Sequence, residues 1–148
     1  MKTTRIKKLM INGISVTTNN KNEMNEDTAK ITGLWDDYEE KNTYSATHDK
    51  ANNSSMYAVY NNYTSDVNGD YDVTVGVEVT KSKKAIVIED EKYLVFKKEG
   101  ELPQVVIETW KEIWDYFENN DEHKRKYSID FEHYTKEEEI EIYISIEK

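Results

Sequence analysis

The sequence predicts an α+β domain in which two β-α-β-β units form one antiparallel sheet with both main helices on one face. Three observations predict this fold. Two segments carry apolar residues at helical spacing, strand-like runs precede and follow each of them, and the two helical segments share a tryptophan-centred motif. A length of 148 residues suits a single domain. We expect pseudo-repeats over about 1–80 and 81–148.

The first unit is predicted to begin with a strand and a helix. The strand covers residues 5–18 and breaks or turns at Asn12-Gly13. The helix covers residues 28–41. Asp27 or Thr28 is its expected N-cap, because such side chains accept hydrogen bonds from the first helical turn.

A polar connector and a hairpin complete the first unit. Residues 43–55 form the connector, which we expect to be mobile or to act as a lid. Strands are predicted over 56–60 and 71–80, with turn residues at Asn68-Gly69 between them.

The second unit is predicted to repeat this order. Two short strands, 85–88 and 93–96, precede a helix over 103–119. That helix begins at the only proline of the chain, because the first helical turn does not need the N–H group that proline lacks. Strands over 128–134 and 140–146 follow.

The two helical segments share a sequence motif. Trp35-Asp36-Asp37-Tyr38-Glu39 matches Trp114-Asp115-Tyr116-Phe117-Glu118, and the elements around them come in the same order. Duplication therefore accounts for the pattern better than chance does. In this register Gly76 corresponds to Tyr143 and Thr74 to Glu141. The two halves share the order of their elements. They differ in the side chains on one face of one strand.

Composition excludes several classes of function. The formal net charge of −10 disfavours direct binding to nucleic acid and favours cations. The chain has no cysteine, and its three histidines lack metal-ligand spacing, so we expect neither a metal nor another cofactor. No apolar run is long enough for a membrane span or a secretory signal, so we expect a cytoplasmic protein.

The last strand carries the first candidate site. Strict alternation puts its isoleucines on one face and Glu141 with Tyr143 on the other. A carboxylate beside an aromatic ring is the minimum needed to hold an organic cation. The solvated face of a half-buried strand has the same pattern, so alternation alone leaves both interpretations open.

Seven segments, in their order along nearly the whole chain, carry a resemblance to a known family. They are Gly33-Leu34-Trp35, Tyr57-Ala58-Val59-Tyr60, Val75-Gly76-Val77-Glu78-Val79, Tyr93-Leu94-Val95-Phe96, Glu108-Thr109-Trp110-Lys111-Glu112-Ile113-Trp114, Asp130-Phe131-Glu132-His133-Tyr134 and Ile140-Glu141-Ile142-Tyr143-Ile144. Together they resemble the GyrI-like effector-binding domains. These are the ligand-sensing modules of multidrug-responsive bacterial transcription regulators and their stand-alone relatives, including the integron-cassette effector-binding proteins.

The resemblance implies a groove between the halves that binds bulky, often cationic and aromatic, small molecules. It places the acidic residue of the family at Glu141, which we expect at the floor of the groove. The implied aromatic walls are Trp35, Tyr60, Trp110, Trp114 and Tyr143. The tryptophans lie on helical stripes, and such stripes more often belong to the core than to the wall of a pocket. Ser145 departs from the family, whose closing strand commonly carries proline here.

The favoured function is effector sensing or sequestration by a binding module, acting in transcription regulation through a protein partner. One alternative is a hydrolase of small electrophiles in which Glu141 activates water beside Tyr143. The sequence shows no nucleophile with a paired base, which disfavours it. Another is an acidic protein-interaction factor such as a topoisomerase inhibitor, although the acidic residues are spread along the chain. We expect a monomer or a weak homodimer.

Overall fold

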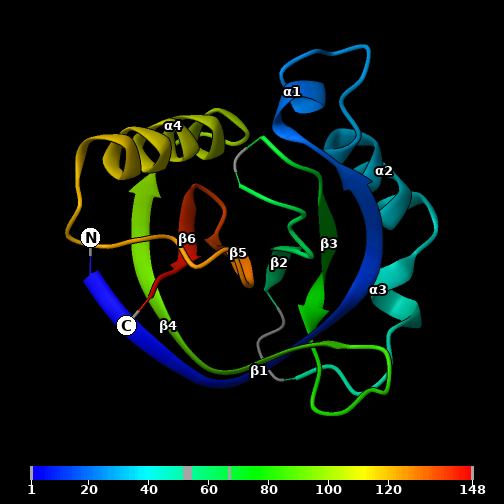
Figure 1. The fold of residues 1–148 in the computed structure, drawn as a ribbon. Helices are drawn as coiled ribbons and strands as arrows, with labels where there is room; N and C mark the ends of the chain where they lie inside the picture. Colours follow the sequence, from blue (N-terminus) through cyan, green and yellow to red (C-terminus); the bar gives the residue numbers. More distant parts are fainter. Residues whose placement is uncertain (1, 52–54, 67, 148) are drawn as a thin grey trace.

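The structure, a computed structural model, is a six-stranded antiparallel sheet with two main helices, and the sheet closes into a barrel (Figure 1). It describes residues 2–51, 55–66 and 68–147. The strand order around the barrel is β1-β3-β2-β5-β6-β4. The strands are β1 (Lys2–Thr18), β2 (Met56–Asn61), β3 (Tyr71–Glu78), β4 (Ile86–Glu99), β5 (Asp130–Lys136) and β6 (Glu139–Ser145). The helices are α1 (Asn20–Glu23), α2 (Ile31–Glu40), α3 (Thr43–Ala46) and α4 (Gln104–Asn119).

β1 is one continuous strand that closes the barrel by changing partner. It pairs with β4 up to Ile11 and with β3 from Ile11 onward. The predicted break at Asn12-Gly13 is therefore wrong. Gly13 instead lets two strands approach closely, because a Cβ atom there would lie 1.8 Å from the carbonyl oxygen of Val75.

β4 is the matching long strand, and it replaces the two short strands predicted over 85–88 and 93–96. The polar residues between them stay in the strand because they face solvent and pair with the polar part of β1. Lys8 lies opposite Glu89, and Arg5 forms an ion pair with Asp90 at 3.0 Å. These opposite charges on β1 help to keep the acidic part of this stretch in the strand.

The central strands have two different faces, and both main helices lie on the same one. On this face Ile142 of β6 lies opposite Glu132 of β5, which in turn lies opposite Ala58 of β2. Helix α4 packs its buried residues against the β6 isoleucines, and α2 packs against β2 and β3. The opposite face lines the barrel interior with a second core that includes Tyr57 and Phe131.

The start of α2 differs from the prediction. The helix begins at Ile31, and neither Asp27 nor Thr28 caps it. Glu23 at the end of α1 takes this role, because its carboxylate accepts from the backbone N–H groups of Lys30 at 2.8 Å and of Ile31 at 3.1 Å. A side chain distant along the chain thus satisfies N–H groups of the first turn.

The predicted connector over 43–55 contains helix α3 and a bridge between Lys50 and Val79. Its residues 52–54 lie outside the described residues, and its mobility stays a prediction. Helix α4 follows Pro103, as expected from the proline. Within the described ranges, no helix is long and apolar enough to cross a membrane.

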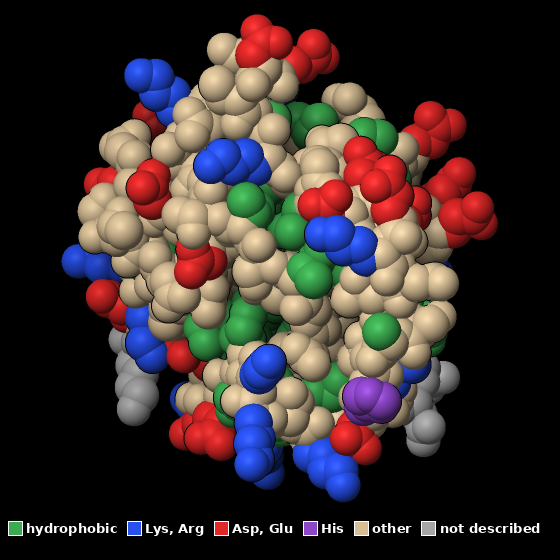
Figure 2. Space-filling model, turned by 90° about the vertical axis from the view of Figure 1, so that its right-hand side faces the viewer, with side chains coloured by type: hydrophobic (Ala, Val, Ile, Leu, Met, Phe, Trp, Pro, Cys, Tyr) green, Lys and Arg blue, Asp and Glu red, His purple; other side chains and the backbone are tan. Residues whose placement is uncertain are grey.

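The face that carries α2 and α3 has a mixed charge. Acidic side chains gather toward its upper and right-hand margins, while lysine and arginine side chains lie near its centre and lower edge (Figure 2). This face does not present the uniform acidic surface that a purely electrostatic interaction factor would use.

Candidate ligand-binding cavity

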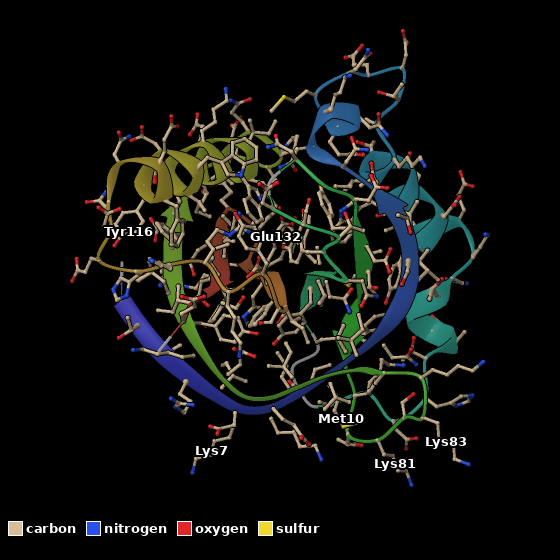
Figure 3. All side chains as sticks on the ribbon, viewed as in Figure 1. Lys7, Met10, Lys81, Lys83, Tyr116 and Glu132 are labelled. Atoms are coloured by element: carbon tan, nitrogen blue, oxygen red, sulfur yellow. The ribbon has the colours of Figure 1, made fainter. Side chains whose placement is uncertain are left out.

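A cavity of about 550 Å³ lies on the helix-bearing face of the sheet. Helix α4 contributes residues at helical spacing, so one side of this helix forms a wall. The rest comes from α1, α2, β2, β3, β5 and connecting segments. Figure 3 shows Glu132 between α4 on one side and β3 with α2 on the other. Residues from all parts of the boundary include Met24, Ile31, Trp35, Tyr60, Tyr63, Tyr71, Val106, Ile107, Trp110, Lys111, Trp114, Arg125, Tyr127, Glu132 and Tyr134.

The aromatic walls connect the two halves of the chain. Trp35 of α2 packs edge-on against Tyr134 of β5, with ring centroids 5.3 Å apart. Trp110 of α4 packs edge-on against Tyr60 of β2, also at 5.3 Å, and lies 6.1 Å from Trp114. Each helix therefore contacts a tyrosine from the other half of the sheet. Edge-to-face rings of this kind hold one another in place.

Glu132 supplies the carboxylate of the cavity, and its side chain is buried. Its Oε2 accepts from the hydroxyl of Tyr60 at 2.8 Å and from the indole N–H of Trp110 at 2.6 Å. Its Oε1 accepts from the hydroxyl of Tyr134 at 2.6 Å. All three donors are neutral. No lysine, arginine or histidine among the described residues forms an ion pair with Glu132.

Burial controls the protonation of this site. It raises the pKa of Glu132 above its ordinary value, and the hydrogen bonds from Tyr134, Trp110 and Tyr60 partly oppose that shift. Burial and the nearby Glu132 charge also raise the pKa values of Tyr60 and Tyr134, so both tyrosines stay neutral donors. Within this hydrogen-bonded group Glu132 is the member that can ionise, and an incoming positive charge would favour that ionisation.

A second buried carboxylate, Asp130, lies two residues earlier on the same face of β5. Its Oδ1 accepts from the backbone N–H and the hydroxyl of Ser145, at 2.7 and 2.9 Å. Its Oδ2 accepts from Tyr63 at 2.6 Å and forms an ion pair with Arg125 at 2.7 Å. Asp130 therefore has a resident cation, and that cation also lines the cavity.

Four predicted site residues come together in the cavity: Trp35, Tyr60, Trp110 and Trp114. Glu141 and Tyr143 do not line it. They lie on the other face of the sheet, because Ile142 between them shares the face of Glu132. Glu141, expected at the floor of a groove, lies outside this cavity, whereas Glu132 lines it.

Glu141 lies instead in a polar cluster on the interior face. Its carboxylate is 3.6 Å from Nδ1 of His133, and the hydroxyl of Tyr143 donates to it at 3.3 Å. Nε2 of His133 lies 2.6 Å from the hydroxyl oxygen of Ser55. The ring of His133 stacks on Tyr57, with centroids 4.4 Å apart. A hydroxyl therefore does have a paired base, which sequence reasoning missed because Ser55 and His133 are far apart in the chain.

Glu132 is the main residue of the cavity that sequence reasoning missed, and the predicted repeat contained a signal for it. Aligning the two halves sets Tyr57-Ala58-Val59-Tyr60 against Phe131-Glu132-His133-Tyr134. Glu132 thus occupies the position that corresponds to Ala58. In each half this position lies between two aromatic positions of a central strand. A buried charge on such a strand is costly, and such charges are typical of functional sites.

Among the residues that the structure describes, no three histidine, aspartate or glutamate side chains lie close enough to share a metal ion. The polar groups of the cavity are instead hydrogen-bond donors and carboxylates, which suit an organic ligand.

Comparisons with known proteins point to one family. Over residues 4–146 the chain matches the family model described as Cass2, integron-associated effector binding protein. YobU of Bacillus subtilis strain 168, provisionally named a transcriptional regulator protein, is 30% identical over 149 residues, which cover 92% of this chain and 91% of YobU.

Two solved structures have a similar fold. An integron cassette protein from the mobile metagenome of Vibrio cholerae has a TM-score of 0.85 at 35% identity, and the match covers 99% of this chain and 95% of that one. SAV2435, solved with bound tetraphenylphosphonium, has a TM-score of 0.76 at 20% identity, with 99% and 93% covered. At that identity the likeness to SAV2435 concerns the fold.

Proposed function

The chain belongs to the Cass2 family of integron-associated effector-binding proteins, and we propose that it binds bulky aromatic cations in the cavity around Glu132. Binding would serve effector sensing or sequestration, with any effect on transcription passing through a protein partner. Trp35, Tyr60, Trp110 and Trp114 supply the aromatic walls.

One observation carries this proposal: Glu132 is buried, accepts from three neutral donors and has no cationic partner among the described residues. Burying a charge is costly unless an opposite charge compensates it. A ligand cation placed against Glu132 supplies that compensation. The site is therefore most complementary to a positively charged guest.

The aromatic rings around Glu132 suit the same guest. A cation over the face of a tryptophan or tyrosine ring gains roughly 0.5–2 kcal/mol per well-placed ring. The rings also exclude water, which strengthens the attraction between the ligand and the carboxylate. The cavity volume of about 550 Å³ falls in the range of drug-sized ligand sites.

Titration calorimetry with tetraphenylphosphonium tests the proposal, since a protein of this fold was solved with that cation bound. Glu132→Gln should weaken binding at least about tenfold, because the amide keeps the shape and removes the charge. Binding of neutral triphenylphosphine oxide should change much less. Glu141→Gln is the matched control, the same substitution on the opposite face of the sheet. Equal losses for both ligands, or equal effects of the two variants, would refute the role of Glu132.

Duplication of a β-α-β-β unit is part of this proposal. The two hairpins pair in the same register, since Tyr57 lies opposite Gly76 and Phe131 opposite Tyr143. Tyr60 and Tyr134 are then equivalent positions, and both donate to Glu132. In this view a groove once symmetric became selective for cations when Glu132 arose in one half and Ala58 stayed in the other.

The cluster on the interior face favours a second candidate function, hydrolysis of small activated esters. Ser55 lies within hydrogen-bond distance of Nε2 of His133, and Glu141 lies behind Nδ1, the order of groups in nucleophilic hydrolases. Burial lowers the pKa of His133, so its neutral form is available as a base. Ser55 Oγ would bond to the carbonyl carbon while its proton passes to His133. The leaving group takes that proton, and water then releases the acid.

Incubation with p-nitrophenyl acetate tests this candidate. Nitrophenol release above the uncatalysed rate should fall to background in Ser55→Ala, and mass spectrometry should locate the acetyl group on Ser55. An exposed hydroxyl on β1 gives the control variant Ser15→Ala. Unchanged release in Ser55→Ala would remove the hydrolase candidate and leave cation binding at Glu132 untouched.

A further inference from the structure

We propose that Arg125 is a second polar contact in the Glu132 cavity, so that the preferred ligands are aromatic cations that also carry a carboxylate or a comparable hydrogen-bond acceptor. This inference rests on the proposed function and names the ligand class more closely. It assigns the cavity two opposite electrostatic ends, with Glu132 at one and Arg125 at the other.

Arg125 has donors left over after its contacts within the protein. Its side chain is 7% exposed and lines the cavity. Of the five N–H groups of a guanidinium, one on Nη2 donates to Asp130. Its Nε is buried without a partner in the part of the chain that the structure describes. Buried donors are nearly always paired, so a lone one suggests a missing acceptor.

Asp130 cannot satisfy Arg125 any further. Both lone-pair regions of its Oδ1 are taken by Ser145, and its Oδ2 is shared between Arg125 and Tyr63. The usual two-bond contact between a guanidinium and a carboxylate is therefore reduced to one bond. Nη1 and the second N–H of Nη2 form no hydrogen bond with the described residues, and we assign them to a ligand on the cavity side.

The guanidinium is held in place for such a contact. Its central carbon lies 4.3 Å from the ring centroid of Tyr127 and 5.9 Å from that of Tyr63. The backbone of Arg125 forms a bridge with Ile146 at the end of β6. A donor that is already fixed loses little conformational freedom when a ligand binds.

The distance between the Glu132 end and the Arg125 end of the cavity fits one aromatic ligand. Asp130, which holds Arg125, and Glu132 are two residues apart on the same face of β5, roughly 7 Å along the strand. A fused or linked ring system covers this distance with a cationic group at one end and an acceptor at the other.

Three probes test the inference: tetraphenylphosphonium, which has no acceptor, a carboxyrhodamine, and the methyl ester of that carboxyrhodamine, which has the same cationic rings. The main variant combines Arg125→Gln with Asp130→Asn, so that no carboxylate is left without its cation. It should lose roughly tenfold or more in affinity for the carboxyrhodamine, less for the ester, and less than about twofold for tetraphenylphosphonium.

Two further variants keep the test decisive. Arg125→Lys retains the ion pair and the fold but lacks the planar fork, and should lose part of the preference for the carboxylate over the ester. Lys111→Gln removes another positive charge from the cavity boundary and should keep that preference. An equal change for all three probes in the double variant and in Arg125→Lys, or no change, overturns the inference. If the wild-type protein does not bind tetraphenylphosphonium, both the proposed function and the role of Arg125 fail. If it binds this cation and the variants behave as just described, only the role of Arg125 fails.

Discussion

Asp130 and Glu132 are both buried carboxylates on the same face of one strand, and they have opposite surroundings. Asp130 contacts a protein cation, Arg125, and accepts from a backbone amide and two hydroxyls. Glu132 accepts only from side chains that carry no charge. The protein thus compensates the charge of Asp130 with its own cation. Two residues along the strand, the charge of Glu132 is not compensated.

The difference distinguishes a structural carboxylate from a binding one. The contacts of Asp130 tie β5 to the segment before it and to the end of β6, and they are complete without a ligand. The contacts of Glu132 come from the walls of a cavity, and they leave a charge that a guest can balance.

Arg125→Gln alone should cause the largest loss of stability. It leaves Asp130 buried without its cation, and breaking a buried ion pair costs about 3–5 kcal/mol. Urea unfolding followed by circular dichroism measures the free energy of unfolding. Adding Asp130→Asn should restore a substantial part of it. If Arg125→Gln unfolds at the wild-type urea concentration, Asp130 does not depend on its cation.

The affinity for tetraphenylphosphonium should fall as the solution is acidified. Burial raises the pKa of Glu132 in the free protein, and a bound cation favours the ionised form. Binding therefore releases protons near the raised pKa and weakens by up to about tenfold per pH unit below it. The same shift makes the free protein lose stability as pH rises from the ordinary pKa of a glutamate through the raised one. Calorimetry over this range measures the effect.

Glu132→Gln serves as the control for that titration, because its affinity should vary little with pH. A wild-type affinity that is constant down to the pH of acid unfolding would show that Glu132 does not titrate with the ligand.

Removing one hydroxyl at a time should separate two equivalent tyrosines. Tyr134 is the only side chain that donates to Oε1 of Glu132 among the described residues, whereas Oε2 has both Tyr60 and Trp110. Tyr134→Phe should therefore raise the pKa of Glu132 more than Tyr60→Phe does, and weaken cation binding near neutral pH by several-fold more. Equal effects of the two variants would argue against this division of hydrogen bonds.

Glu141→Gln should have the smallest effect, less than about twofold on the affinity for tetraphenylphosphonium. Its carboxylate is on the interior face with His133 and outside the cavity. A loss of affinity as large as that of Glu132→Gln would indicate a ligand site on the interior face. It would contradict the assignment of Glu132 as the carboxylate that binds the cation.

Much of the fold could be predicted from the sequence, because apolar periodicity identified both main helices and the two hairpins. The breaks predicted in β1 and β4 were wrong, since a glycine pair and a charged stretch look like turns until the neighbouring strand is known. Local pattern carries no information about that neighbour.

The candidate site was predicted in part. The family resemblance implied the aromatic residues, four of which line the cavity. Alternation correctly put Glu141 on the face away from the isoleucines. We expected the ligand site on that face, whereas the cavity lies on the other one. The cavity shares the face of the isoleucines, because α2 and α4 both pack there and leave space between them. Which face receives the helices is a property of the whole fold.

The closed barrel gives the site a fixed length scale. β5 pairs with a strand on each side in a sheet without free edges, so it stays extended and the distance along it between Asp130 and Glu132 stays constant when a ligand enters. The walls come from helices and loops, where side chains can rearrange. We expect such a protein to bind ligands of many shapes and to select them by the distance between their charged groups.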